Sequence, residues 1–224
     1  MLILAADTSG KQGSIALARG REDGTCEVME VLALAGGTFS AQLVPQVAAL
    51  LTKHGFTKKH IDAFAVASGP GSFTGLRVGL AAVKALAEVL EKPIATVSVL
   101  EALAVAAGPR GKVLAVLDAG RGDVYVGDYD VSDDSAKLVQ ERLSGMTEFL
   151  AETRRSKVAT SDAGLAQALQ AAGMSVSIIE PLCAGAVARV GWRKLRHGAI
   201  VSPEELEANY IRGSHAEIFA KSSS

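Results

Sequence analysis

The sequence predicts an α/β protein built from two similar lobes, of which the second is the smaller. Three observations support this fold class. Residues 1–97 read as three strands followed by alternating helices and strands. An apolar strand that ends in aspartate occurs twice, at Asp7 and at Asp118, about half a chain apart. Hydrophobic residues make up 49% of the 224 positions, which is enough for a substantial core.

The elements of the first half follow from its hydrophobic pattern. Apolar runs predict strands at 2–6, 14–18 and 26–34, and the segment 21–24 predicts a hairpin turn. Residues 40–54 have apolar side chains at helical spacing, with Pro45 expected to perturb the first turns. A strand at 63–67, a helix at 75–91 and a strand at 94–97 complete the half. Three antiparallel strands followed by parallel strands joined by helices is the order of a ribonuclease-H-like lobe.

The second half repeats the beginning of this pattern and then becomes less regular. Strands are predicted at 113–118, 124–129, 137–140 and near Val158, with helices near Glu148 and at 164–172 and 184–196. Two similar halves favour the duplicated actin, Hsp70 and sugar-kinase (ASKHA) fold with a reduced second lobe. We therefore expect an N-terminal lobe at 1–108 and a smaller C-terminal lobe at 109–224 with a frayed tail.

A glycine-rich segment between the fourth predicted strand and its helix is the most informative part of the chain. Three glycines and a proline within a few residues predict a tight, shaped turn, and Thr74 is a plausible N-cap for the helix. The backbone N–H groups of such a turn could bind an anion, or the glycines could serve shape alone. The residues of this signature loop are Ser68, Gly69, Pro70, Gly71, Ser72, Phe73, Thr74, Gly75 and Arg77.

The signature loop resembles that of the TsaB (YeaZ) family, and three further segments agree in the same order: 3–9, 117–125 and 210–212. The resemblance implies a non-catalytic paralogue of TsaD, often classed as glycoprotease M22-like. It would be a scaffold for threonylcarbamoyl transfer to adenosine 37 of tRNA (t6A). The implied partners are a TsaD-like catalytic subunit and a TsaE-like ATPase, which would carry the ATP and metal, with no cofactor on this chain. The chain would reach tRNA through the complex and form a homodimer without its partner.

Few residues of this chain are candidates for catalysis or for phosphate binding. Asp7, Thr8, Ser9 and Asp118 stand where members of the fold hold phosphates, so they could form a working or vestigial phosphate cleft. Alternatively, the two aspartates cap turns through hydrogen bonds to the backbone. No pair among the four histidines has metal-ligand spacing, so we expect no metal and no catalytic residue. A stand-alone ATP-dependent phosphotransferase remains the main alternative, and a glycopeptidase-like hydrolase a weaker one.

Net charge, cysteine content and the lengths of the apolar runs limit the class of protein and its cellular compartment. The net charge is −1, so the chain is not a basic nucleic-acid-binding domain. Cys26 and Cys183 form no motif and predict free thiols in a reducing compartment, the cytoplasm. The first apolar run stops at Asp7, too short for a leader, and no run predicts a membrane span.

The helix at 75–91 has more apolar surface than one sheet can cover. Its apolar residues spread over more than half of a helical wheel, whereas packing on a sheet needs a stripe of about 100°. The helix at 40–54 has a similar excess, which predicts that the two helices bind a partner subunit. The alternative is that the same residues form internal core. The interface residues predicted are Leu43, Val44, Val47, Leu51, Leu76, Gly79, Leu80 and Val83.

Overall fold

The computed structural model describes residues 1–108, 110–132, 135–153 and 157–211. Its first sheet has the strand order β3-β2-β1-β4-β5. The strands β1 (Leu2–Asp7), β2 (Gly13–Gly20) and β3 (Cys26–Leu34) are antiparallel, and β4 (Ala63–Gly69) and β5 (Ile94–Ser98) continue the sheet parallel to β1. The predicted hairpin turn joins β2 to β3, where the Gly24 N–H donates to the Arg21 carbonyl at 3.1 Å.

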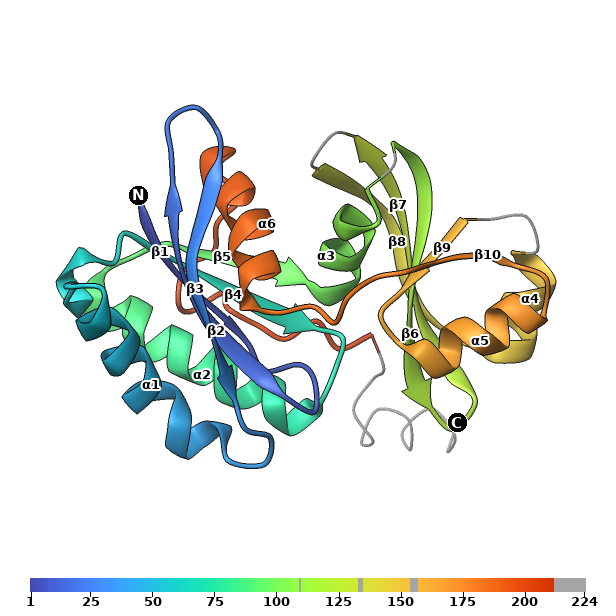
Figure 1. The fold of residues 1–224 in the computed structure, drawn as a ribbon, viewed down its shortest axis with the longest axis horizontal. Helices are drawn as coiled ribbons and strands as arrows, with labels where there is room; N and C mark the ends of the chain where they lie inside the picture. The colour runs from blue at the N-terminus through green and yellow to red at the C-terminus, as the bar shows by residue number, and fades with distance from the viewer. Residues whose placement is uncertain (109, 133–134, 154–156, 212–224) are drawn as a thin grey trace.

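Helices cover both faces of this sheet (Figure 1). On one face lie α1 (Phe39–Lys53) and α2 (Phe73–Leu90), which contact each other and share a core with Leu4, Leu17 and Phe64. On the other face lies α6 (Ala184–Arg196), against the alanines of β1, β2 and β4. A short 3-10 helix, η1 (Lys58–His60), precedes β4.

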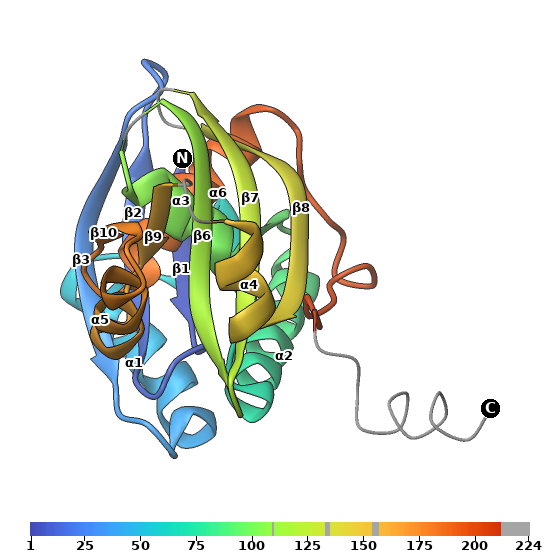
Figure 2. The ribbon, with the colours of Figure 1, turned by 90° about the vertical axis from the view of Figure 1, so that its right-hand side faces the viewer.

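The second sheet repeats the topology of the first. Its order is β10-β9-β6-β7-β8, and Figure 2 looks onto it. The strands β6 (Gly111–Gly120), β7 (Asp123–Ser132) and β8 (Ser135–Gly145) are antiparallel, whereas β9 (Lys157–Thr160) and β10 (Ser175–Ile178) extend the sheet parallel to β6. Helices α4 (Met146–Glu152) and α5 (Ala163–Ala171) cover its outer face. The duplication predicted from the two aspartate-ended strands is confirmed.

Each half places its last helix on the other half's sheet. Helix α3 (Val99–Ala106), which follows β5, packs on β6 and β7 through Leu100 and Leu103. Helix α6 follows β10 and packs on the first sheet, and the two helices touch between the sheets (Figure 1). The two-lobed ASKHA fold is thus present. The division at residue 108 remains a prediction, since both lobes exchange a helix across it.

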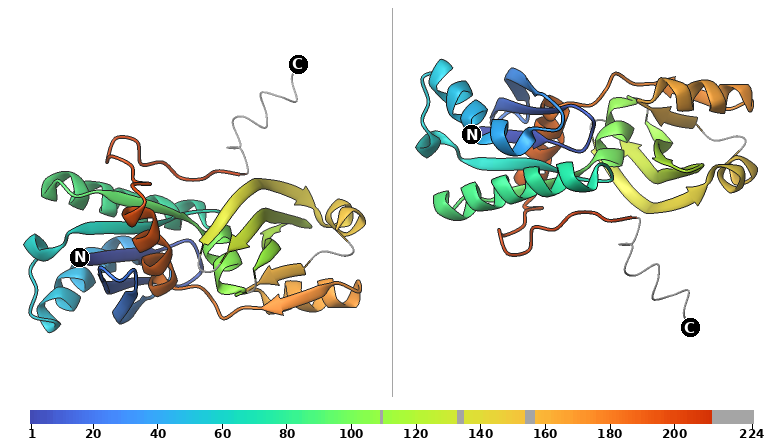
Figure 3. Two further views of the ribbon diagram at one scale, coloured as in Figure 1. Left: turned by 90° about the horizontal axis from the view of Figure 1, so that it is seen from above. Right: turned by 90° about the horizontal axis from the view of Figure 1, so that it is seen from below.

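The last described segment returns along the first lobe. Residues 199–211, here called the strap, run from α6 past β5 towards the second lobe (Figure 3). The Val201 N–H donates to the Ile94 carbonyl at 2.9 Å, and Leu206 is buried in the core beneath α2. The strap therefore covers part of the apolar surface that the helical wheel left over.

Most predicted elements are present with ends shifted by a few residues. Three were missed: α3, whose eight residues are almost all apolar, the short strand β10 and the 3-10 helix η1. The N-cap of α2 was assigned to the wrong residue. The helix begins two residues earlier than predicted, and Ser72, not Thr74, caps it by accepting a hydrogen bond from the Gly75 N–H at 3.2 Å.

Candidate functional site

The signature loop turns the chain from the end of β4 into α2. Ser68 and Gly69 end the strand, Gly69 with φ of +116°, and the Gly69–Pro70 peptide bond is cis. Phe73, Thr74 and Arg77 lie on the exposed side of the first turns of α2. Two N–H groups here have carbonyl partners within the chain: Ser72 N donates to the Ser9 carbonyl at 2.7 Å and Leu76 N to the Ser72 carbonyl at 2.8 Å.

The loop and α2 pack directly against the chain at the end of β1. The buried Thr8 hydroxyl donates to the Gly75 carbonyl at 2.7 Å. A Cβ at Gly75 would approach the Thr8 carbonyl oxygen to well under 3.0 Å, a separation that Cβ atoms essentially never show. Gly79, one turn on, is equally close to the Thr8 side chain. These contacts give the glycines a shape role: they let α2 lie against residues 7–9.

Asp7 is buried at the end of β1. Its Oδ1 accepts hydrogen bonds from the Ser9 N–H at 2.9 Å and the Ser9 hydroxyl at 2.6 Å. Burial raises the pKa of the Asp7 carboxyl, and the two Ser9 hydrogen bonds offset only part of the rise. Asp118, at the end of β6, is exposed, and its Oδ1 accepts from the Gly120 N–H at 2.9 Å. Both aspartates thus make the turn-capping bonds that one of the two interpretations predicts.

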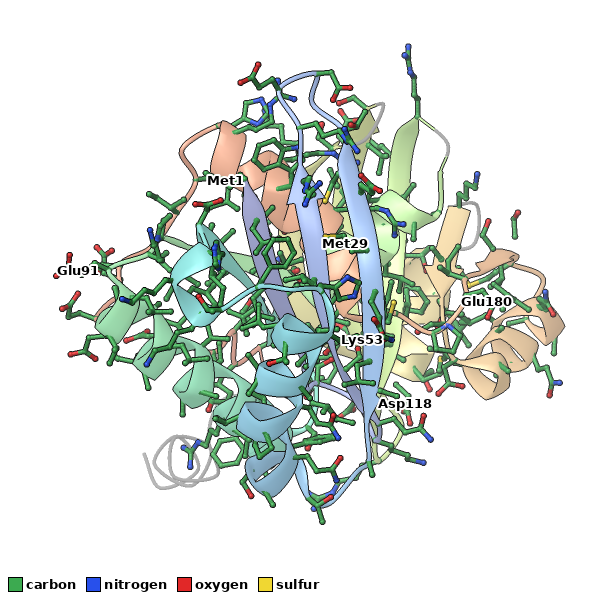
Figure 4. All side chains as sticks on the ribbon, turned by 60° about the vertical axis from the view of Figure 1, so that its left-hand side comes forward. Met1, Met29, Lys53, Glu91, Asp118 and Glu180 are labelled. Atoms are coloured by element: carbon green, nitrogen blue, oxygen red, sulfur yellow. The ribbon has the colours of Figure 1, made fainter. Side chains whose placement is uncertain are left out.

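A cleft of about 930 Å³ separates the lobes at this point. It brings together the predicted phosphate positions Asp7, Ser9 and Asp118, whereas Thr8 points away from it into the contact with α2. Asp162 of the second lobe and Lys11 of the first also line it. Figure 4 labels Asp118, which lies two residues before the end of β6 at Gly120. The lining thus includes three aspartates and one lysine, and burial favours the neutral form of one of these aspartates, Asp7.

No three histidine, cysteine or carboxylate side chains in the ranges that the structure describes lie together as metal ligands would. No helix within those ranges has the length and hydropathy needed to cross a membrane.

The predicted interface residues fall mostly inside the molecule. Leu76, Gly79, Leu80 and Val83 of α2 are buried, as are Leu43, Val47 and Leu51 of α1. Val44 is different, with 54% of its surface exposed. Most of the larger apolar side chains of both helices are therefore buried, and the exposed apolar positions are mostly alanine, with Val44, Phe73 and Val89 as exceptions.

The outward surface of α1 is mostly apolar, whereas that of α2 carries the charged residues Arg77 and Glu88 beside exposed alanines. Figure 4 shows α1 and α2 side by side, with Glu91 at the end of α2. Between their N-terminal halves runs a groove of about 450 Å³, in which Arg77 is the one charged lining residue among those the structure describes. We give the name α1–α2 face to seven of the exposed apolar residues of the pair: Ala41, Val44, Ala48, Ala49, Phe73, Ala81 and Ala85.

Sequence reasoning missed a polar cluster at the junction of the lobes. Glu141 of β8 accepts hydrogen bonds from Ser98 at the end of β5, from Tyr129 of β7, and from the Asn209 amide of the strap at 2.5 Å. Nearby, Lys194 of α6 pairs with Glu101 of α3 at 2.7 Å. The donors to Glu141 are separated by tens of residues, so no local motif announces the cluster.

Comparison with known proteins places the chain in a family. The model of the family described as TsaD, tRNA N6-adenosine threonylcarbamoyltransferase, matches residues 33–194. The tRNA threonylcarbamoyladenosine biosynthesis protein TsaB of Bacillus subtilis is 40% identical over 131 residues, 58% of this chain and 55% of that protein. The TsaB of Escherichia coli is 37% identical over 132 residues, again 58% and 55%. The chain thus matches about half the length of these curated relatives.

A solved structure extends the likeness to nearly the whole chain. YeaZ from Pseudomonas aeruginosa superposes with a TM-score of 0.74 and 25% identity, over 93% of this chain and all of that one. The sequence match, the family model and the shared fold agree with the signature loop. The chain therefore belongs to the TsaD-like family and, within it, to the TsaB (YeaZ) proteins.

Proposed function

We propose that this chain is a non-catalytic scaffold subunit for t6A formation and that it acts by binding and organising a TsaD-like catalytic subunit. The role in t6A rests on relatives that carry the name tRNA threonylcarbamoyladenosine biosynthesis protein. The scaffold part rests on one observation, the α1–α2 face. Two adjacent helices expose small apolar side chains over several turns, and apolar patches of this kind on a soluble protein mark interaction sites.

The partner chemistry follows from the family match. A TsaD-like subunit shares the family model that matches this chain across all of α1 and α2, so it would present a related helix pair. Alanine on the outward positions lets two helix pairs approach closely, which favours a packed four-helix contact. In this proposal a TsaE-like ATPase completes the assembly, and ATP and metal reside on the partner subunits. The chain pairs with itself when the partner is absent.

The charge balance supports an indirect contact with tRNA. With a net charge of −1 the chain offers little attraction for phosphates, so the partners would supply most of the RNA contacts. The basic end of α6 does not argue otherwise, because Trp192 is buried and donates to the Gly24 carbonyl at 3.0 Å. A cytoplasmic location belongs to the same proposal and fits the two free cysteines.

A reconstituted reaction tests the proposal. Purified TsaD-like and TsaE-like proteins, threonylcarbamoyl-adenylate and tRNA are combined with or without this chain, and t6A is measured by mass spectrometry. We expect t6A to form only when the chain is present and a complex with the TsaD-like subunit to be seen by native mass spectrometry. Equal t6A without the chain, or no complex, would overturn the proposal.

Two matched variants locate the contact. Val44→Arg places a charge in the α1–α2 face, and its exposed position lets the monomer fold. Burying that charge on association costs several kcal/mol, so pairing and t6A should be lost together. Val139→Arg makes the same change at an exposed valine of β8, 61% exposed, and should leave both intact. Pairing that survives Val44→Arg would move the interface elsewhere.

The alternative function, an ATP-dependent phosphotransferase, would use the cleft between the lobes as its active site. Replacing Asp7 distinguishes this alternative from the scaffold proposal. Under the scaffold proposal Asp7→Ala leaves partner-dependent t6A within a few-fold of wild type, and calorimetric titration of the chain with Mg-ATP shows little heat. A loss on the order of a thousandfold in a folded variant is typical of a residue that acts in the transition state. That result would make Asp7 catalytic and overturn the scaffold proposal.

A further inference from the structure

Three side chains form a pile at the N-terminal end of α2. The Phe73 and Tyr210 rings lie 5.3 Å apart between centroids, and the Arg77 guanidinium carbon lies 3.8 Å above the Phe73 ring. Arg77 Nε donates to the Tyr210 hydroxyl at 3.2 Å. Tyr210 belongs to the strap, so the pile joins the last described residues of the chain to the signature loop.

The strap holds Tyr210 in place from both sides. The Asn209 N–H donates to the Ser68 carbonyl at 2.7 Å, and the Asn209 side chain donates to Glu141. On the far side of Tyr210, Ile211 packs with the core of the second lobe. A ring fixed by its backbone loses little conformational entropy when it binds something, which makes it a favourable contact residue.

The two aromatic rings of this cluster nevertheless remain about half exposed to solvent. Phe73 is 47% exposed and Tyr210 is 44% exposed. A purely structural aromatic pair would be buried, since each ring gains most by leaving water. Exposed tyrosine, phenylalanine and arginine together are instead the composition of binding hot spots. The pile also borders the groove of the α1–α2 face, which Phe73 and Arg77 line.

We infer that Phe73, Arg77 and Tyr210 act as one recognition element of the α1–α2 face, which receives a carboxylate of the TsaD-like subunit. This inference rests on the proposed function and adds to it a residue from the strap. Charge complementarity with Arg77 is the reason for proposing a carboxylate as the partner group. Arg77 is the one charged residue among the described lining of an otherwise neutral groove, and a docked apolar helix would remove its water.

The geometry of Arg77 suits this role. Its Nε is engaged by Tyr210 and its plane rests on Phe73, which orients the guanidinium. Within the described residues neither Nη has a hydrogen-bond acceptor, so both can donate to one carboxylate in the bidentate geometry that arginine favours. The partner side chain is therefore an aspartate or glutamate on an otherwise apolar helix.

Binding measurements with the TsaD-like subunit test the inference. Tyr210→Ala and Arg77→Gln should each weaken association at least tenfold, and the double variant little more than the stronger single one, because the two residues act together. Tyr210→Phe keeps the ring and should show a smaller loss. Arg19→Gln, at an exposed arginine of β2, is the control and should bind like wild type. Melting temperatures report that each variant is folded.

Salt separates a charged contact from a merely structural one. The affinity of the wild-type chain for the TsaD-like subunit should fall as the salt concentration rises from 50 to 500 mM, because exposed charges are screened over this range of ionic strength. The affinity of Arg77→Gln should fall less. Wild-type affinity in Tyr210→Ala or Arg77→Gln would overturn the inference while leaving the proposed function standing. If the wild-type chain does not bind the TsaD-like subunit, the proposed function fails first. If the variants lose only self-association, the occupant is a second copy and the inference is wrong.

Discussion

Gly75→Ala offers a sharp test of why the signature loop is rich in glycine. Gly75 lies in the first turn of α2, where helix propensity alone favours alanine by up to about 1 kcal/mol. The tertiary structure predicts the opposite sign. A Cβ at this position would meet the backbone carbonyl of Thr8, which directly follows the buried strand β1 and cannot rotate away as a side chain could.

The size of the loss follows from two contacts. Forcing an extra carbon into a packed site costs about 1–3 kcal/mol. Displacing α2 also strains or breaks the buried hydrogen bond from the Thr8 hydroxyl to the Gly75 carbonyl, worth about 1 kcal/mol. After the propensity gain is subtracted, we expect a net destabilisation of about 1–3 kcal/mol. For a chain of this length that lowers the melting temperature by roughly 2–4 °C per kcal/mol.

Urea unfolding followed by circular dichroism measures the change. Gly145→Ala is the matched control, since a Cβ there meets nothing within 4 Å and φ is −66°, which alanine adopts readily. The control should unfold close to wild type. A Gly75→Ala midpoint at or above the wild-type value would refute the reasoning and return the loop to a binding role.

Three further predictions follow from burial. Asp7→Asn should stabilise the protein at neutral pH. Because burial raises the pKa of Asp7 in the folded state, the wild-type protein loses stability as pH rises from about 3.9 through that folded-state pKa. The stability advantage of the variant should therefore vanish in acid. An advantage that is the same at every pH would contradict this. Glu141→Leu leaves three donors without their shared acceptor and should cost about 2–4 kcal/mol in urea unfolding, with Glu141→Gln milder. Val83→Arg should abolish folding, because Val83 is 1% exposed, whereas Val44→Arg should give a normal circular dichroism spectrum; a folded Val83→Arg variant would show that α2 turns another face to the core.

The sequence alone determined the topology of the first lobe and the existence of the second. Strand β3 and helix α6 were predicted with the bounds that the structure gives them, because alternating and helical hydrophobic patterns are local properties of the chain. The repeated strand ending in aspartate predicted the duplication for the same reason. Helix α3 was missed because a short, almost uniformly apolar run has no periodicity that separates helix from strand.

Only the tertiary structure decided which side of an apolar helix faces inward. The wheel of α2 showed excess apolar surface, but the sheet, α1 and the strap, which includes the buried Leu206, together bury Leu76, Leu80 and Val83. Periodicity cannot reveal this, since it describes one helix and burial depends on every neighbour. The meeting of Tyr210 with Arg77, 133 residues earlier in the chain, and the three donors on Glu141 are products of the same long-range packing.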